Sequence, residues 1–349
     1  MSGTTTGRNN KKASRNSGAR ASIGAHGEDV LELLFRVGGC TADQLEQFLG
    51  LRYTVARRTL SRLEAHKYIA TTHDYARYQE KKELTGENGS GRPAEYYYLT
   101  ASGQDYAGQL AGAEDNAESR ECYKRHNLPG LSAHSSIENR VLLSVLSAAE
   151  KEPGWSVPLS EVWCESAFDY PLATAEKKGK GSQVREVEPD GEFVATTPYG
   201  RSIYMLEVES DMRGRRLVRK IEDYASWMRR AELVRPLLFV GLSRRQASSM
   251  RMAAKRSLAA STGEWKKWAD LFGRKAKGRG AEGQVSPLHL IGFAALQDVE
   301  GMYASKGLSA PVWQVLDEAR GEPLALSLSE MALLASEARE MLYGVREVS

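Results

Sequence analysis

Apolar residues recur at helical spacing through the first part of the chain. Between residues 28 and 37 they return every three or four positions, and the pair Gly38-Gly39 ends the pattern. Thr41-Ala42-Asp43-Gln44 has the form of a capping box, in which a threonine hydroxyl and a glutamine amide bind the free backbone groups of a new helix. The pattern therefore predicts a second helix as far as Leu49 and a third over residues 52–66.

Aromatic and β-branched residues follow these helices and predict two strands. The strands cover residues 68–72 and 95–100, and a glycine-rich tip at residues 85–93 lies between them. Three helices followed by a two-stranded wing are typical of a winged helix-turn-helix domain, whose third helix normally lies in the DNA major groove. We therefore expect residues 25–112 to form a DNA-binding domain of this type.

Basic residues occupy both the third helix and the wing of this domain. The side chains that we expect to contact DNA are Arg52, Arg57, Arg58, Ser61, Arg62 and Lys67 from the helix region and Lys81, Lys82 and Arg92 from the wing. The alternative is a protein-interaction or dimerisation module whose arginine-rich face is merely solvated.

A second pattern of elements follows an acidic, small-residue linker at residues 113–125. In order, we predict a helix from residue 131, a strand around 162–165, two strands joined by a turn at 197–201, a helix over 213–230, an apolar strand over 236–242 and a basic helix over 244–260. This order predicts a small mixed sheet flanked by helices, within one α/β domain over residues 126–349. The whole chain is therefore expected to be α+β.

The last part of the chain gives weaker signals. We expect a basic, glycine-rich loop over residues 273–284, a strand over 289–296 and a helix over 326–341. Trp265 and Trp268 have helical spacing and are expected in the core, with stacking against nucleic acid bases as the alternative.

Acidic side chains gather at the predicted hairpin of the second domain. Glu207 and Glu209 should project from one face of a strand, roughly 7 Å apart, because strand side chains alternate. The hairpin should bring Asp190 beside Glu207, and the long side chain of Lys220 on the next helix can reach back to these acids. Three convergent carboxylates predict a site for an oxygen-preferring cation, Mg²⁺ or Mn²⁺.

Two further residues are candidates to support this site. His134 and Glu138 are one helical turn apart, so both can face the same neighbour. A core or helix-capping role for His134, and a surface network of acids and lysine without a metal, are the alternatives.

These residues carry a resemblance to a known family. Pro189-Asp190-Gly191, Leu206-Glu207-Val208-Glu209 and the pattern Lys-Ile-x-x-Tyr at residues 220–224 resemble motifs of the PD-(D/E)XK nuclease superfamily. With His134 and the preceding winged helix, residues 28–260 look like the replication-relaxation family, which includes the MOBC-type relaxases of mobilisable plasmids. One departure is Glu209, because the superfamily usually has lysine at that position; Lys220 is the candidate replacement.

The resemblance implies a metal-dependent endonuclease that nicks double-stranded DNA at a plasmid or mobile-element origin of transfer, in conjugation, mobilisation or replication. It implies Asp190, Glu207, Glu209 and Lys220 as catalytic residues, with the three acids as metal ligands and Glu138 and His134 in support. One alternative is a non-cleaving DNA-binding protein with a degenerate nuclease fold that acts in replication or transcription control. Another is a restriction-like or defence nuclease.

Composition is consistent with this interpretation. The chain has 349 residues, of which 41% are hydrophobic and 27% charged, and its formal net charge is +3. A basic leader at residues 1–24 lacks the apolar residues needed to fold, and is expected to be a disordered arm that touches nucleic acid or is only solvated. Three widely spaced cysteines and no long apolar run predict a cytoplasmic protein that does not enter the membrane. Mobilisation or replication proteins are expected partners, and a homodimer is left open.

Overall fold

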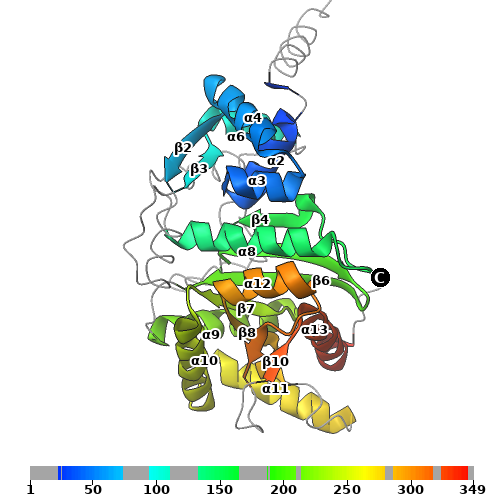
Figure 1. Cartoon of the computed structure of the whole chain (residues 1–349). Coiled ribbons are helices and arrows are strands. Elements are labelled where there is room, and N and C mark those ends of the chain that lie inside the picture. The colour runs from blue at the N-terminus through cyan, green and yellow to red at the C-terminus, as the bar shows by residue number, and fades with distance from the viewer. Residues whose placement is uncertain are drawn as a thin grey trace, which may run out of the picture. The chain divides into compact units, whose positions relative to one another are not determined.

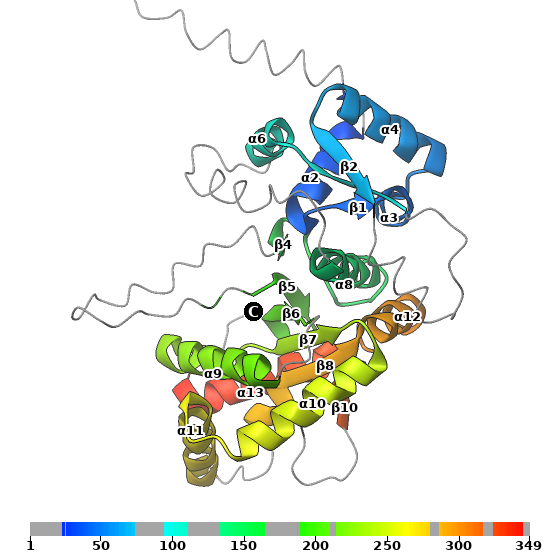
Figure 2. The same cartoon turned by 90° about the vertical axis from the view of Figure 1, so that its left-hand side faces the viewer.

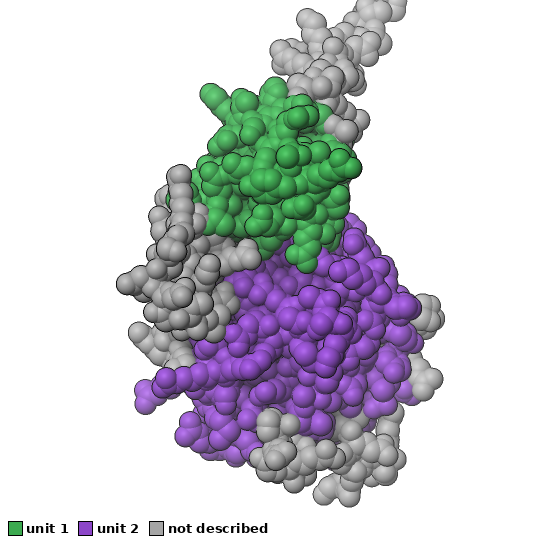
Figure 3. Space-filling view, in the orientation of Figure 1, with its two compact units in different colours: residues 1–74, 91–130 green, residues 75–90, 131–349 purple. Residues whose placement is uncertain are grey.

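The computed structural model describes residues 23–24, 26–73, 94–110, 133–164, 187, 189–209, 214–279, 286–316 and 324–344. The chain is α+β and divides into two compact units, residues 1–74 with 91–130 and residues 75–90 with 131–349 (Figure 3). The predicted linker at residues 113–125 lies outside the described residues, as does most of the predicted arm.

The first unit combines helices with a small antiparallel sheet (Figure 1). Its helices are α2 (Gly27–Val37), α3 (Ala42–Leu49), α4 (Tyr53–Ala65) and α6 (Ala101–Leu110). The sheet has the order β1 (Cys40–Thr41), β3 (Glu95–Leu99), β2 (Ile69–His73). The three helices and two strands predicted for this region are therefore present, together with the short strand β1, which the sequence pattern did not indicate.

Local sequence signals set the ends of these helices. Gly38 adopts a left-handed conformation with φ of 81° directly after α2, a conformation that glycine reaches without a Cβ clash. The predicted capping box at the start of α3 is formed, because Thr41 accepts from the amide of Gln44 and the Gln44 side chain accepts from the amide of Thr41. These interactions explain why two helices follow each other so closely along the chain.

The expectation that residues 1–24 form a solvated arm is wrong at its last positions. Ile23 is fully buried, and its side chain lies so close to Gly27 that a Cβ there would be 2.9 Å from it. The apolar side chain of Ile23 is removed from water because it packs against the first turn of α2.

The second unit is built on a seven-stranded mixed sheet of order β10-β9-β8-β7-β6-β5-β4. The strands are β4 (Val162–Cys164), β5 (Gly191–Thr197), β6 (Gly200–Val208), β7 (Leu237–Gly241), β8 (Ile291–Ala295), β9 (Trp313–Val315) and β10 (Leu324–Leu326). Strands β6, β7 and β8 run parallel, whereas the pairs on either side are antiparallel. The expected mixed sheet is confirmed and is larger than predicted.

Helices cover both faces of this sheet (Figure 2). They are α8 (Ala133–Ala149), α9 (Gly214–Ala231), α10 (Arg244–Ala259), α11 (Glu264–Arg279), α12 (Leu296–Lys306) and α13 (Leu328–Tyr343). Helices α9, α10, α11 and α13 share one buried apolar cluster with β6, β7 and β8, while α8 and α12 pack together on the other face. Every residue of β7 is buried, as expected for a central strand covered on both faces.

Several expectations for the last part of the chain are corrected. The loop predicted from Gly273 is wrong over its first half, because α11 continues to Arg279. Trp265, Trp268 and Phe272 bury one face of this helix, and a single glycine costs a helix only about 1 kcal/mol. Base stacking by the two tryptophans is excluded by the same burial.

Helix α12 and the strands β9 and β10 were not predicted from the sequence. The strand predicted over residues 289–296 ends at Ala295, and α12 begins at Leu296. The final helix begins at Leu328, because Ser327 and Glu330 form a capping box there, and residues 324–326 belong to β10. Among the described residues, no helix combines the length and apolar character needed to cross a membrane.

Two glycines of α6 provide a test of packing in the first unit. A Cβ at Gly103 would lie 1.8 Å from the backbone carbonyl oxygen of Tyr68, whereas a Cβ at Gly108 would meet only the Phe35 ring at 3.9 Å. We expect Gly103→Ala to destabilise the first unit by about 2 kcal/mol or more, because backbone must move. Gly108→Ala, in the same helix, should be neutral or stabilising by up to about 1 kcal/mol. Urea denaturation monitored by circular dichroism measures both, and equal effects of the two variants would contradict the packing described.

Candidate active site

The hairpin of β5 and β6 brings Asp190 beside the end of β6. Gly191 pairs with Leu206 in an antiparallel register, so the residue before Gly191 lies next to the residue after Leu206. The Asp190 Oδ2 atom accepts a hydrogen bond from the backbone amide of Val208 at 2.6 Å. The sequence predicted this proximity of Asp190 to Glu207 from the turn and the strand lengths.

Lys220 lies among three carboxylates. Its Nζ atom donates to Oε2 of Glu207 and lies 3.1 Å from Oε1 of Glu209 and 3.7 Å from Oδ2 of Asp190. We call Asp190, Glu207, Glu209 and Lys220 the acidic cluster. Its carboxylates are almost entirely buried, with side-chain exposures of 8%, 1% and 5%, while the Lys220 side chain is 22% exposed. The acids therefore do not form the solvated surface network that was the alternative interpretation.

Helix α9 delivers two side chains to Glu207. Apolar residues that include Leu217 and Ile221 hold its inner face against the core, and Lys220 and Tyr224, four residues apart, project from neighbouring positions. The Tyr224 hydroxyl donates to Oε1 of Glu207 at 2.5 Å. Both oxygens of this fully buried carboxyl group therefore have a hydrogen-bond partner, as a buried polar group requires.

His134 and Glu138 reach the same region from α8. The His134 Nε2 atom lies 3.2 Å from Oδ1 of Asp190. Glu138 is buried, and its Oε1 atom is 3.4 Å from the position that a Cβ on Gly191 would take. Both supporting residues thus face the start of β5, as their spacing predicted. His134 faces a site carboxylate, so it is neither an isolated core histidine nor the N-cap of α8, since it lies inside that helix.

Burial and charge set the protonation of the cluster. Burial and the neighbouring Asp190 raise the pKa of Glu207, despite Lys220 and Tyr224. Burial alone would also raise the pKa of Asp190, but His134 and Lys220 outweigh it and lower that pKa. Burial opposes the charge of Lys220, yet Glu207 and Asp190 raise its pKa. Lys220 is therefore a fixed cation at neutral pH rather than a proton acceptor.

Gln246 holds the end of β6 and was not singled out from the sequence. Its Nε2 atom donates to the backbone carbonyl of Glu209 at 2.6 Å, and its Oε1 atom accepts from the amide of Leu242 at 2.8 Å. Ser243 caps α10 by accepting from the Gln246 amide, and this spacing of serine and glutamine is ordinary at the start of a helix. The glutamine side chain instead fixes the residue that presents the third carboxylate.

The donor chemistry of the cluster suits a hard cation, because Mg²⁺ and Mn²⁺ prefer carboxylate oxygens. The Oε1 atom of Glu209 is buried and makes no hydrogen bond, but it pairs with the Lys220 ammonium at 3.1 Å. Within the described part of the chain, no group of three or more His, Cys, Asp or Glu side chains is arranged to hold a metal. In this arrangement Lys220 neutralises the oxygens that a cation would need.

The predicted DNA-binding residues of the first unit have different environments. Arg52, Arg58, Ser61, Arg62 and Lys67 are exposed on α4 and at its two ends. The Arg57 guanidinium donates to Glu95 and, at 2.5 Å, to the Tyr97 hydroxyl, so it is neutralised by β3. Lys81, Lys82 and Arg92 lie outside the described residues.

Comparisons with known proteins give no relative. No family model matches the chain, and no curated protein or solved structure matches it.

Removing the cation of the acidic cluster should destabilise the second unit in a pH-dependent way. In Lys220→Met the buried carboxylates lose their partner, and breaking a buried ion pair costs about 3 kcal/mol or more. Asp190 and Glu207 would then hold protons in the folded state at pH values where the unfolded chain, with carboxyl pKa values of about 4, has lost them. Stability of the variant relative to wild type should therefore fall as pH rises from about 5 to 8.

Urea denaturation at both pH values measures this effect. Lys267→Met, at an exposed lysine with 60% side-chain exposure, is the matched control and should change stability by less than about 0.5 kcal/mol. Adding Glu207→Gln to Lys220→Met should recover part of the loss at pH 8. A pH-independent cost would show that the carboxylates are not charged partners of Lys220.

Proposed function

We propose that this protein is a metal-dependent DNA endonuclease that nicks double-stranded DNA, of the relaxase type, at an origin on a plasmid or other mobile element. The observation that carries the proposal is the convergence of Asp190, Glu207, Glu209 and Lys220 in one cluster. The origin and the mobilisation role rest on the resemblance to the replication-relaxation family.

The order of elements supports a PD-(D/E)XK type of nuclease fold. Helix α8 is followed by the antiparallel strands β4, β5 and β6, then by α9, and β7 pairs in parallel with β6. One acid precedes the second of these strands and two acids end the third, which is the order of the superfamily's motif. Lys220 comes from the following helix and contacts Asp190, Glu207 and Glu209, so it is the candidate for the lysine that the superfamily usually has at position 209.

Phosphodiester hydrolysis requires a nucleophilic water and stabilisation of charge on the phosphate. The Lys220 ammonium, held charged by its neighbours, is suited to stabilise that charge. His134 contacts Asp190 and retains 24% side-chain exposure, so its imidazole reaches solvent at the edge of the cluster. Since His134 and Lys220 are the most exposed of these residues, the phosphate would approach on their side.

Asp190, Glu207 and Glu209 are the residues that would hold Mg²⁺ or Mn²⁺. A divalent cation supplies a nucleophile at neutral pH and a countercharge for the phosphate. The backbone amide of Val208 and the Tyr224 hydroxyl orient Asp190 and Glu207, so the protein fixes two of the proposed ligands before any ion binds.

The first unit supplies the proposed DNA-reading surface. Helices α2, α3 and α4 followed by β2 and β3 have the order of a winged helix-turn-helix domain, and β1 pairs with β3. Arg58, Ser61 and Arg62 share the exposed face of α4, where recognition helices of this class contact DNA.

A specific observation favours a second candidate, a non-cleaving DNA-binding protein. Lys220 already neutralises Glu207, and within the described residues no set of side chains is arranged to hold a metal. In that case the cluster stabilises a degenerate nuclease fold, and the protein acts through DNA binding in replication or transcription control.

Nicking of supercoiled plasmid separates the two candidates. With Mg²⁺ or Mn²⁺, the wild-type protein should convert plasmid carrying DNA from around its own gene to the open circle. Asp190→Asn and Glu207→Gln keep side-chain shape and should lower the rate about 100-fold or more while DNA binding persists. Asp298→Asn, at an acid paired with Arg244 far along the chain, is the matched control. No nicking by the wild type would favour the non-cleaving protein, and cleavage of both strands at unrelated sites would favour a defence nuclease.

Substitutions on α4 test the proposed DNA surface independently of cleavage. Arg58→Ala and Arg62→Ala should weaken binding to duplex DNA, and each lost phosphate contact should reduce the slope of log affinity against log salt by about 1. Arg57→Ala should have a smaller effect, because Glu95 and Tyr97 already hold that guanidinium. Fluorescence anisotropy at several salt concentrations measures these slopes. Unchanged affinity in both exposed-arginine variants would exclude α4 as the DNA surface.

A further inference from the structure

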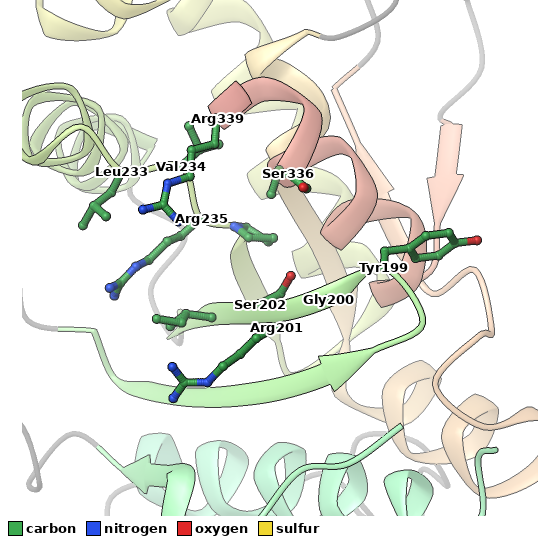
Figure 4. Close-up of a pocket in the computed structure, with 12 residues that line it drawn as sticks. Tyr199, Gly200, Arg201, Ser202, Leu233, Val234, Arg235, Ser336 and Arg339 are labelled. Carbon is green, nitrogen blue, oxygen red and sulfur yellow. The ribbon is translucent and has the colours of Figure 1, made fainter. Parts of the chain in front are cut away.

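A pocket opens at the beginning of β6, at the opposite end of this strand from the acidic cluster. Its lining comes from the start of β6, the connection between α9 and β7, and α13 (Figure 4). Ser202 in the lining precedes Glu207 by five positions, which corresponds to about 16 Å of extended strand. The pocket is therefore separate from the proposed catalytic site.

Three arginines line this pocket and make it basic. Arg201 comes from β6, Arg235 from the segment before β7 and Arg339 from α13, and Ser202 and Ser336 add two hydroxyl groups. Figure 4 shows the three arginine side chains at one end of the lining and Tyr199 at the other. None of the described residues that line the pocket is acidic, so the lining has a net positive charge.

Surrounding residues hold two of these arginines in place. The Arg235 Nη1 atom lies 3.3 Å from Oε2 of Glu192, and the Arg235 side chain is only 13% exposed. Its guanidinium carbon is 5.1 Å from the centre of the Trp227 ring. Arg201 pairs with Glu161 at 3.0 Å. Glu192 and Glu161 lie outside the lining, and the planar guanidinium can bind a carboxylate with one nitrogen while another faces a ligand. The site is therefore organised before any ligand binds.

The size of the pocket limits the ligand. The pocket volume is about 40 Å³, and a cavity needs a volume of about 10–15 Å³ to hold one water. The space matches roughly three waters or one tetrahedral oxyanion, and is too small to enclose a base or a sugar. Arginine is the side chain best suited to bind phosphate oxygens with two parallel donors.

We propose that this arginine pocket binds a single phosphate group. The phosphate belongs either to the backbone of bound DNA or to a small molecule such as inorganic phosphate or a nucleotide. In the first case the pocket anchors the duplex about five base pairs from the acidic cluster, since duplex DNA rises about 3.4 Å per base pair. The inference does not rest on cleavage, because it concerns a separate site.

Binding measurements with two probes test the proposal. Inorganic phosphate is titrated calorimetrically, and a 20-base-pair duplex is titrated by anisotropy at several salt concentrations. Arg201→Gln should leave the fold intact because that side chain is 56% exposed. Arg339→Gln changes the part of the lining that comes from α13. Arg256→Gln, at an exposed residue of α10 outside the lining, is the matched control, and circular dichroism verifies that each variant is folded.

We expect both pocket variants to lower the affinity for one of the two probes about tenfold relative to the control. Loss of inorganic phosphate binding would identify a small-molecule ligand. Weaker duplex binding with a salt slope reduced by about 1 would identify a DNA phosphate. Either result supports the pocket even if the protein does not nick DNA. If neither probe responds to Arg201→Gln or Arg339→Gln more than to Arg256→Gln, the proposal is overturned.

Discussion

The second unit depends on one electrostatic arrangement, a lysine ammonium among three buried carboxylates. Carboxylates this far from water are stable only when a partner compensates for the free energy of hydration that they lose. Lys220 supplies the charge, Tyr224 and the Val208 amide supply hydrogen bonds, and His134 contacts Asp190. The same set joins β5, β6, α8 and α9, so the interaction that compensates the buried charge also fixes the relative positions of these elements.

Strand register is the constraint that assembles this arrangement. Because side chains alternate, a slip of one residue between β5 and β6 would turn Glu207 to the other face of the sheet and separate it from Lys220. The short turn after Thr197 and the burial of β6 oppose such a slip. Gln246 adds a further restraint at the end of the strand by binding the carbonyl of Glu209. The acidic cluster, in which three carboxylates surround the Lys220 ammonium, is thus built from features that also specify the fold.

Local signals allowed much of this structure to be predicted from the sequence. The capping box at Thr41, the apolar strand β7 and the hairpin that brings Asp190 to Glu207 are all encoded within a few residues of where they act. Elements that depend on distant partners were missed. Helix α11 passes through Gly273 because its aromatic face is buried by other helices, and β9 and β10 exist only by pairing with β8 and with each other. Gln246 was missed because its spacing from Ser243 also fits an ordinary cap.

We propose that the acidic cluster acts on a phosphate with the help of a divalent cation. A crystal structure of the wild-type protein with Mn²⁺ and a short DNA duplex tests it most directly. We expect an anomalous manganese peak in contact with Asp190 and at least one of the two glutamates, and a backbone phosphate on the side where Lys220 and His134 reach solvent. Clear DNA density without manganese at these carboxylates, and with Lys220 still bound between them, would contradict it.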